Sequence, residues 1–560
     1  MNRIILTAVP EDFDSDKDIL LGPWSLIGKE DMHPHWVNYN IEPDPFNSAD
    51  EIAFHAKQTT DFAESYMNKL SIMLNKVNNT EYSLDFWRQL VFPWLLSLIQ
   101  TAWERQLRIN KILEKYSDLE VKITLSNDIE HWRFKDTIDH QQNGLINHHY
   151  NHWLFSRLLE QRVPANWNIE WIETESRTKD ISAEKRSLKR IIKDLYSNIF
   201  LSSTVYGMGK LEAIFFEILV FIKSLFISRT IKNKQKPQKT NFELDWNLDL
   251  DKVVQKSIPL CFTEINNYLN NKLYHRKLYL VGPIVWYDEK EKVKLAEAVE
   301  NGSKIIVTQH GGSYGTSKAF CFPPALEYNH FKFISWGWKK QEDYQGNIIP
   351  LPSPLLSKYK YKYKKINNNV ILVSTLIPLY WYRISSIVQA NQLIEYRNAK
   401  INFIDSINIE VYKNLLFRSF LYEVGTLSDK EYVERRYPDI KILEGNLHKE
   451  SMRCGLLVVD HPDTTLNIAL AANIPTVCFW DKDIWSICRQ AEPYFQTLRD
   501  VGILFNNGRE AAEKVNEIWD DVTGWWEQPH IQKAREEWCW QYARTSKNWR
   551  WEWIKAIWKL

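Results

Sequence analysis

The sequence predicts an α/β protein in which short buried strands alternate with helices and form parallel sheets. KLYLVGPI at 277–284 is typical of a strand, EKVKLAEAVENG at 291–302 of a helix, and SKIIVTQHGG at 303–312 of the next strand with its loop. The same alternation runs from VILVSTLIPLYW at 370–381 to IPTVCFW at 474–480. Such units hold parallel strands whose loops gather at the carboxyl edge of the sheet. At 560 residues the chain is also too long for one hydrophobic core.

A polar stretch of low complexity, YKYKYKKINNN at 359–369, marks a boundary between two domains. We expect residues 1–365 to form a Rossmann-like domain with helical insertions, and residues 366–510 to form a second Rossmann-like domain. The tryptophan-rich residues 511–560 are expected to be helices that pack back on the first domain.

The first elements of the chain follow from local pattern. RIILTAV at 3–9 is rich in β-branched residues and predicts a strand, so the chain starts inside a sheet. From 51 to 116 the apolar spacing is helical, with a break or kink expected at Pro93. Residues 229–249 are polar, basic and irregular, which indicates a surface loop.

The most apolar stretch, AIFFEILVFIKSLFI at 213–227, is not a membrane span. Glu217 and Lys223 interrupt it, and it is shorter than the ~20 residues that a transmembrane helix needs. We expect a buried core helix here, because a long protein must contain such helices. The alternative is a helix whose apolar residues dock on a membrane surface.

Composition excludes some classes of partner. With 71 Lys and Arg against 70 Asp and Glu, no global field draws the protein to nucleic acid. The six cysteines are widely spaced without a C-x-x-C pair, which argues against a disulfide framework and favours a reducing cytoplasm. The first residues turn acidic after about seven apolar positions, unlike a signal peptide. We expect a cytoplasmic protein.

The first candidate site is VTQHGGSYG at 307–315, which has three of the chain's 18 glycines within five residues. Glycines after a buried strand let the backbone approach a ligand, and their amides can point at phosphate or carboxylate oxygens. The spacing fits neither the Rossmann fingerprint nor the P-loop. His310 at the start of the loop could be a general base or a neutral donor to a leaving phosphate. Equally, it could only hydrogen-bond the turn.

The second candidate site opens the helix that follows VVD at 458–460. Asp463 is a natural N-cap, and the free amides and hydroxyls of Thr464 and Thr465 would suit a phosphate. Capping alone would also explain Asp463 and one threonine. Arg418 interrupts an apolar strand and needs an anion or a carboxylate partner.

The sequence favours chemistry without a metal. His148, His149 and His152 lie close together, but adjacent histidines point in different directions on a helix or a strand. The D-x-D triplets at 248–250 and 481–483 look like loop charges. No metal and no cofactor is expected.

Five segments together resemble a known family: LLGPWSL at 20–26, FWRQLVFPWLLSLIQ at 86–100, VTQHGGSYG at 307–315, FISWGW at 333–338 and TTLNIALAANIPTVCFW at 464–480. They are similar to those of a bacterial family of sugar transferases encoded near O-antigen, capsule and nonulosonic-acid genes. The resemblance implies a GT-B-like fold, with two Rossmann-like domains whose parallel sheets face each other across a cleft. It also implies a glycosyltransferase that builds a cell-surface glycan.

The resemblance implies a nucleotide-sugar donor held between an acceptor-side domain, 1–365, and a donor domain, 366–510. A CMP-activated nonulosonic or ulosonic acid is one candidate donor, and the acceptor is a glycan, a lipid-linked molecule or a protein. Peripheral contact with the inner face of the plasma membrane is a minor hypothesis, and it rests on the apolar stretch at 213–227. Donor binding is assigned to Gly311, Gly312, Ser313, Tyr314, Arg418, His461, Asp463, Thr464 and Thr465, and catalysis to His310, with Glu264 and Glu327 as further acid/base candidates.

One departure from the family pattern leaves two alternatives open. Such transferases often have a glutamate in the donor-site helix after the paired threonines, where this chain has Asn467 and Ile468. His461 and Pro462 match only weakly the HP pair that some bacterial sialyltransferases use for the CMP phosphate. The alternatives are a non-catalytic scaffold that binds glycans, and a CDP-polyol phosphotransferase of the same fold.

Overall fold

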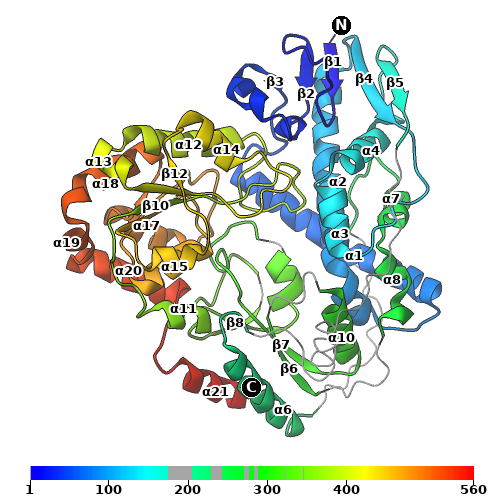
Figure 1. Cartoon of the computed structure of the whole chain (residues 1–560). Coiled ribbons are helices and arrows are strands. Elements are labelled where there is room, and N and C mark those ends of the chain that lie inside the picture. The colour runs from blue at the N-terminus through cyan, green and yellow to red at the C-terminus, as the bar shows by residue number, and fades with distance from the viewer. Residues whose placement is uncertain are drawn as a thin grey trace, which may run out of the picture.

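The computed structural model describes residues 2–174, 205–228, 242–269, 276–282, 288–320, 322–344 and 346–559 (Figure 1). Across these residues the strands form three sheets, and every pairing between named strands is parallel. The α/β class with parallel sheets is therefore confirmed. Residues 1–365 were expected to form one Rossmann-like domain, but they contain two separate sheets.

The first sheet has the strand order β3-β2-β1-β4-β5 and lies at the top of Figure 1. Its central strand β1 pairs with both β2 and β4, so the chain fills one side of β1 first and then returns to the other. The strands are β1 (Asn2–Ile5), β2 (Asp18–Leu20), β3 (Asn40–Ile41), β4 (Val121–Ser126) and β5 (Asn168–Ile172).

Two long helices, α1 (Ala49–Asn78) and α2 (Leu84–Tyr116), connect β3 to β4 and pack along each other. Serine caps both: Ser48 accepts a hydrogen bond from the Glu51 amide, and Ser83 accepts one from the Phe86 amide. A break or kink was expected at Pro93; a break is absent, since α2 runs continuously from Leu84 to Tyr116. Packing on α1 and α10 offsets the backbone hydrogen bond that proline removes.

The second sheet has the order β6-β7-β8-β9 and lies near the bottom of Figure 1. The strand–helix–strand unit predicted at 277–312 is confirmed as β6, α10 and β7 with parallel strands. The strands are β6 (Leu278–Val281), β7 (Lys304–Thr308), β8 (Lys332–Ser335) and β9 (Asn347–Pro350). The other helices of this half are α3 (Thr137–His140), α4 (His148–Leu159), α6 (Lys210–Leu225), α7 (Leu250–Ser257), α8 (Leu260–Thr263), α10 (Glu289–Glu300) and α11 (Pro354–Tyr359), with π-helical turns at Gln141–Leu145 and Pro324–Tyr328.

The third sheet has the order β12-β11-β10-β13-β14-β15, and its four-residue strands β10, β13 and β14 are buried throughout. Its strands are β10 (Val370–Val373), β11 (Leu415–Arg418), β12 (Lys441–Ile442), β13 (Leu456–Val459), β14 (Thr476–Phe479) and β15 (Leu504–Phe505). Its helices are α12 (Leu393–Ser406), α13 (Ile409–Lys413), α14 (Asp429–Arg436), α15 (Leu447–Ser451), α16 (Thr464–Ala472) and α17 (Glu492–Asp500).

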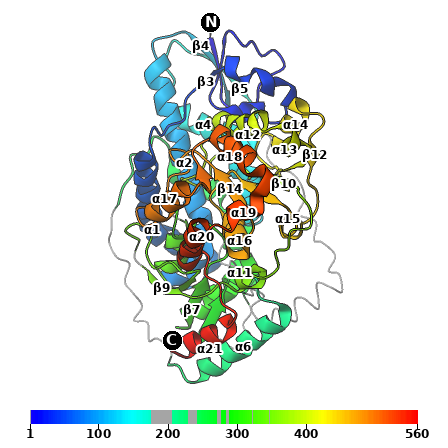
Figure 2. The same ribbon diagram turned by 90° about the vertical axis from the view of Figure 1, so that its left-hand side faces the viewer.

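The C-terminal helices divide between the two later sheets. Helices α18 (Gly508–Ile518) and α20 (Pro529–Tyr542) pack on α12, α16 and α17 of the third sheet, with α19 (Val522–Trp526) between them. Helix α21 (Trp549–Lys559) crosses to the second sheet, where Trp553 donates a hydrogen bond to the carbonyl of Pro352 at 2.8 Å. The chain after α20 reaches the same sheet, because the Arg544 amide donates a hydrogen bond to the Trp336 carbonyl at 2.8 Å. In Figure 2 α21 lies beside α6 at the end of the molecule opposite the N-terminus. None of the described helices is long and apolar enough to span a membrane.

Candidate active site

The carboxyl edges of the second and third sheets meet. The loop after β7 reaches the N-terminus of α16, where the Gly312 amide donates a hydrogen bond to Thr464 Oγ1 at 2.7 Å. Farther along the same loop, the Thr316 carbonyl accepts a hydrogen bond from the Cys488 amide at 2.7 Å, and the Ala319 carbonyl accepts one from the Ser386 amide at 2.8 Å. The two motifs predicted to form one site therefore lie in direct contact.

Gly312 lies directly against the N-terminus of α16. A Cβ atom at this position would lie 2.4 Å from the backbone carbon of Asp463 and from the amide nitrogen of Thr464, closer than real Cβ atoms come. At Gly311 the nearest atom would be Thr464 Oγ1 at 3.4 Å, which is ordinary contact. The second glycine is therefore required by packing against α16, and its amide is already engaged by Thr464.

Gln309, which belongs to no predicted set of site residues, connects this loop to the loop after β8. Its side-chain oxygen accepts hydrogen bonds from the Trp336 amide and from Trp338 Nε1, both at 2.8 Å. Its side-chain nitrogen donates to the Gly311 carbonyl at 2.8 Å. A buried glutamine with these partners fixes the course of the glycine loop.

His310, Tyr314 and Glu327 form a chain of hydrogen-bonding groups. The Tyr314 hydroxyl donates a hydrogen bond to Glu327 Oε2 at 2.9 Å, and the Tyr314 hydroxyl oxygen lies 3.1 Å from His310 Nδ1. Because the hydroxyl hydrogen goes to the carboxylate, the oxygen accepts from His310, which assigns the ring proton to Nδ1. Burial lowers the pKa of His310 to about 4, so the ring is neutral at neutral pH and Nε2 is its basic nitrogen.

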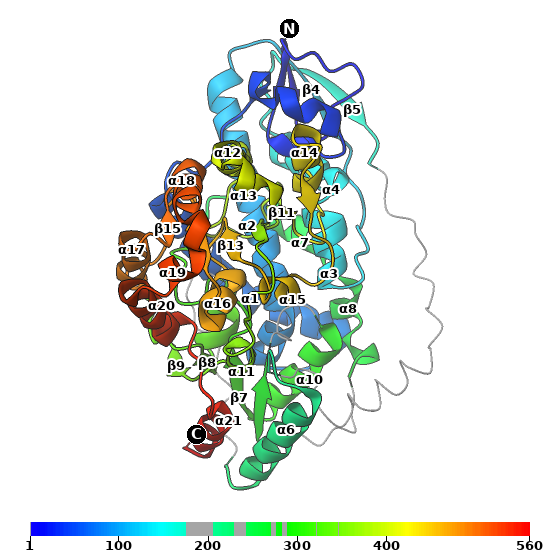
Figure 3. The ribbon, with the colours of Figure 1, turned by 60° about the vertical axis from the view of Figure 1, so that its left-hand side comes forward.

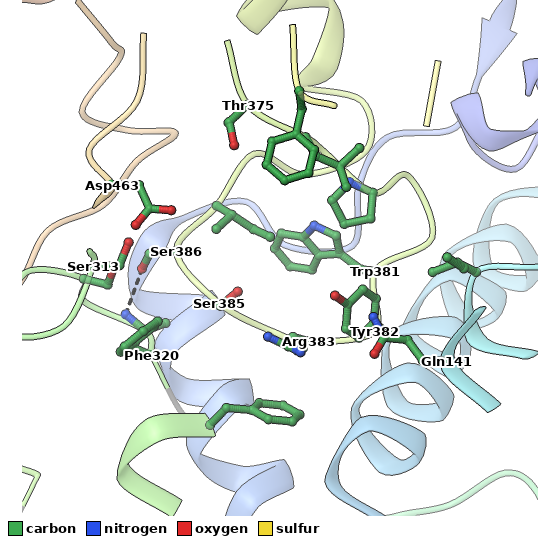
Figure 4. A pocket seen from close by; sticks show the side chains of 18 of the residues that line it. Gln141, Ser313, Phe320, Thr375, Trp381, Tyr382, Arg383, Ser385, Ser386 and Asp463 are labelled. Atoms are coloured by element: carbon green, nitrogen blue, oxygen red, sulfur yellow. Dashed lines mark hydrogen bonds between the residues drawn. The ribbon is translucent and has the colours of Figure 1, made fainter. Parts of the chain in front are cut away.

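A pocket of about 570 Å³ opens beside this loop (Figure 4). Both halves of the chain contribute to it: Ser313 and Phe320 come from the loop after β7, while Thr375, Arg383 and Asp463 come from the third sheet and its connections. Aromatic rings form much of its wall, namely those of Phe320, Phe322, Trp381, Tyr382, Phe420 and Tyr422. Small-molecule sites have this size and this mixture of rings with a few polar groups.

Among the described residues that line the pocket, Arg383 is the one cationic side chain, and no motif identified in the sequence pointed to it. In Figure 4 its side chain lies in the middle of the labelled residues. Its guanidinium carbon lies 4.8 Å from the Phe322 ring centre and 4.9 Å from that of Tyr382. Burial lowers the pKa of Arg383 to about 9, so it stays charged at neutral pH. The segment YWYRISS, in which an arginine follows three rings, was the available signal.

Two of the predicted donor residues, Ser313 and Asp463, line the pocket, and Tyr314 is buried behind Phe320 with their ring centres 5.2 Å apart. Asp463 accepts a hydrogen bond from the Thr464 amide at 2.7 Å, so it caps α16 as expected. Thr465 occupies the second position of α16, where it is partly exposed.

Three predicted site residues, Arg418, His461 and Glu264, contact other groups of the protein and do not line the pocket. Arg418 donates to the carbonyls of Leu443 and Gly445 at 2.7 and 2.9 Å, and burial lowers its pKa. His461 Nδ1 lies 2.8 Å from Asp460 in the interior. Glu264 is exposed and accepts a hydrogen bond from Asn267 at 3.2 Å. The described lining of the pocket includes none of these three side chains.

Among the described residues, no three His, Cys, Asp or Glu side chains are grouped so that they could hold a metal ion. The histidines of the NHHYNHW segment line a second pocket of about 590 Å³ at the first sheet. His148 Nδ1 lies 2.8 Å from the Tyr380 hydroxyl, and His152 Nδ1 lies 3.1 Å from Thr7 Oγ1. Burial lowers the pKa of each of these two rings to about 4.

The site thus lies between two parallel sheets, at the edge where open α/β sheets generally bind their ligands, and the protein is of the α/β class with parallel sheets. The sequence matches the family model of the LIC12162 family transferases over residues 2–557. The chain belongs to this transferase family, so the expectation of a transferase is confirmed.

None of the curated proteins matches the chain. Among solved structures it is similar to MurG of Acinetobacter baumannii, at 11% identity over 79% of this chain and 99% of that one, with a TM-score of 0.30. It is similar to WaaG, a glycosyltransferase involved in lipopolysaccharide biosynthesis, at 10% identity over 63% and 98%, with a TM-score of 0.26. It is also similar to a UDP-GlcNAc 2-epimerase from Neisseria meningitidis bound to UDP-GlcNAc, at 10% identity over 75% of this chain and 98% of that one, with a TM-score of 0.27. TM-scores this low support no conclusion about the present chain.

The contact at Gly312 predicts a difference between two neighbouring substitutions. Gly312→Ala should lower the free energy of unfolding by about 1–3 kcal/mol, because the added methyl group must displace the N-terminus of α16. Gly311→Ala should change it by less than about 1 kcal/mol, since its Cβ meets only one side-chain oxygen at 3.4 Å. Chemical denaturation of both variants measures this, and equal effects would contradict the packing argument.

Proposed function

We propose that this transferase is a glycosyltransferase that holds a nucleotide sugar in the pocket between the second and third sheets. The observation that carries the proposal is the partly buried guanidinium of Arg383 among aromatic rings, beside the glycine loop that ends at Tyr314. A nucleotide sugar combines flat rings with negative charge. The rings of the pocket can stack on its base or sugar, and Arg383 can pair with its phosphate.

The proposed donor is a CMP-activated nonulosonic acid. The proposed acceptor is a glycan, a lipid-linked molecule or a protein that becomes part of the cell surface. Such a donor carries a carboxylate as well as a phosphate. Arg383 offers five N–H donors in a fixed plane, which suits either group. Its partly apolar surroundings strengthen such a pairing, because the effective dielectric constant there is lower than that of water. This finer assignment rests on the sequence resemblance together with the charge of the pocket.

In the proposed reaction His310 acts as the general base. Its Nε2 accepts the proton of an acceptor hydroxyl, the hydroxyl oxygen forms a bond to the anomeric carbon, and the bond from that carbon to the phosphate oxygen breaks. The electron pair leaves with the nucleotide phosphate, whose charge Arg383 balances. Tyr314 and Glu327 position the ring through Nδ1. His310 lies outside the described lining of the pocket, so the acceptor must approach from the side of the glycine loop.

The role of His310 predicts both a rate and a pH profile. His310→Ala should lower kcat by about 10²–10⁴-fold with the fold retained, as measured by sugar transfer and circular dichroism. For the native enzyme kcat/KM should stay level from neutral pH downward and fall only near pH 4, because the neutral ring is required and its pKa is about 4. A fall centred near 6.5 would contradict this assignment.

Controls separate the base from its positioning partners. Tyr314→Phe should lower kcat while KM changes little, and should move the acid limb of the profile, since Nδ1 loses its hydrogen-bond partner. His131→Ala, at an exposed histidine, should leave the rate unchanged. Unchanged turnover in His310→Ala would remove this residue from the mechanism.

The role of Arg383 predicts a loss of nucleotide binding. CMP, UDP, GDP and CDP are compared by thermal shift, since a ligand that binds only the native state stabilises it by RT ln(1+[L]/Kd). Arg383→Ala should weaken the binding of the preferred nucleotide by about 1.5–3 kcal/mol, the range for a hydrogen bond to a charged group. Arg489→Ala is the control, because Arg489 is exposed and pairs with Glu342.

The outcomes distinguish the other functions. No response to any nucleotide would contradict the proposal and favour a glycan-binding scaffold. A preference for CDP, with transfer of phosphorus together with a polyol, would identify a phosphotransferase. The scaffold alternative was based on the absence of a glutamate in α16, where this chain has Asn467. The Asn467 side chain is buried and accepts a hydrogen bond from Trp538 Nε1 at 3.0 Å.

A further inference from the structure

Helix α6 is apolar on two faces, which is unusual for a helix at the surface. One face is buried: Ala213, Phe216 and Val220 recur at helical spacing. Phe216 and Val220 pack in a small core with Leu278 of β6 and Trp553 of α21. The expectation of a core helix at 213–227 is therefore met by this face alone. A surface helix normally carries polar residues on its other side.

The other face of α6 is an exposed apolar stripe. Leu211, Phe215, Ile218, Ile222 and Leu225 follow at intervals of four, three, four and three residues, which places them along one side of the helix. Leu211 is 82% exposed and Leu225 is 53% exposed. Phe226, directly after the helix, is 75% exposed. Single exposed apolar side chains need no explanation, but a continuous stripe indicates a binding surface.

Helix α21 extends this stripe with tryptophans. The two helices lie side by side at one end of the molecule (Figures 2 and 3). Lys223 donates a hydrogen bond to the Trp558 carbonyl at 2.7 Å, and the rings of Phe226 and Trp558 are 6.5 Å apart. Trp551 and Trp558 are 58% and 43% exposed. We call these exposed side chains the α6–α21 surface: Leu211, Phe215, Ile218, Ile222, Leu225, Phe226, Trp551 and Trp558.

The charges around the α6–α21 surface are mainly basic. Residues 210–226 and 546–559 contain six Lys or Arg and three Glu. Two of the three glutamates are occupied, since Glu212 pairs with Arg550 and Glu217 pairs with Arg276. The long basic side chains can lay their stems along the apolar stripe and hold their charges outward.

We propose that the α6–α21 surface docks the protein on an anionic membrane, with both helices lying in the lipid interface. An apolar stripe, tryptophans beside it and a basic surrounding are the features of helices that lie on a bilayer. The net positive charge of the two segments complements anionic headgroups, whereas a protein groove would need no such charge. This inference goes beyond the proposed function, because it depends on neither the pocket nor the transferred group.

The test is co-sedimentation of the full chain with phosphatidylcholine vesicles that contain or lack phosphatidylglycerol. The native protein should bind the anionic vesicles, and binding should weaken with added salt or without phosphatidylglycerol. Replacing Leu211, Phe215 and Phe226 together by Asp should lower the partition coefficient by at least about tenfold, since three apolar side chains no longer enter the interface. Fold is checked by circular dichroism, and sugar transfer to a water-soluble acceptor should be retained.

The matched control replaces three equally exposed apolar residues elsewhere, Val37, Ile72 and Ile409, by Asp, and this variant should bind vesicles like the native chain. An equal loss in both variants would overturn the proposal, as would native protein that binds neither kind of vesicle. Gel filtration in which the α6 variant changes from dimer to monomer, with no vesicle binding by either protein, would make the surface a protein interface and also overturn it.

Discussion

The close approach between Gly312 and the N-terminus of α16 is the contact on which the site depends. With no side chain on Gly312, the glycine loop of the second sheet lies directly against Asp463 and Thr464 of the third. Further backbone hydrogen bonds, from Cys488 to Thr316 and from Ser386 to Ala319, hold the rest of the loop in place. The pocket exists because these two sheet edges are kept together beside it.

The interior behind the third-sheet edge is unusually charged. Lys400 lies 2.7 Å from Asp429 and 3.5 Å from Asp460, and Arg397 lies 2.8 Å from Asp429, all of them buried. Together these cations hold the pKa of Asp429 at about 2 against the opposing effect of burial. Removing one partner would leave a buried charge uncompensated, which costs far more than an exposed pair is worth. Asp460 of this cluster also lies 2.8 Å from His461 Nδ1, and His461 is not among the described residues that line the pocket.

The two proposals place different demands on the chain. The pocket needs aromatic rings and one charged group in an enclosed place, so that a bound anion is paired where water is scarce. The α6–α21 surface needs rings in an exposed place, on helices held to the second sheet by Phe216, Trp549 and Trp553. The high aromatic content of the sequence, 14%, serves both, and most of the remaining rings fill the core.

Local patterns determined much of this protein. The parallel strand–helix order, the cap at Asp463 and the special status of the 307–315 loop all follow from periodicity and from the preferences of glycine and aspartate, which act within a few residues. The continuity of α2 across Pro93 did not follow, because packing against other helices outweighs a local preference.

Only the tertiary structure decided which distant residues share a site. It separated the first 365 residues into two sheets, because alternation shows that strands are parallel but not which strands pair. In the folded chain Arg418 donates hydrogen bonds to two carbonyls, and Arg383 is the arginine that lines the pocket. Which side chains hundreds of residues apart come into contact depends on how the sheets pack. The spacing of residues along the chain does not determine that packing.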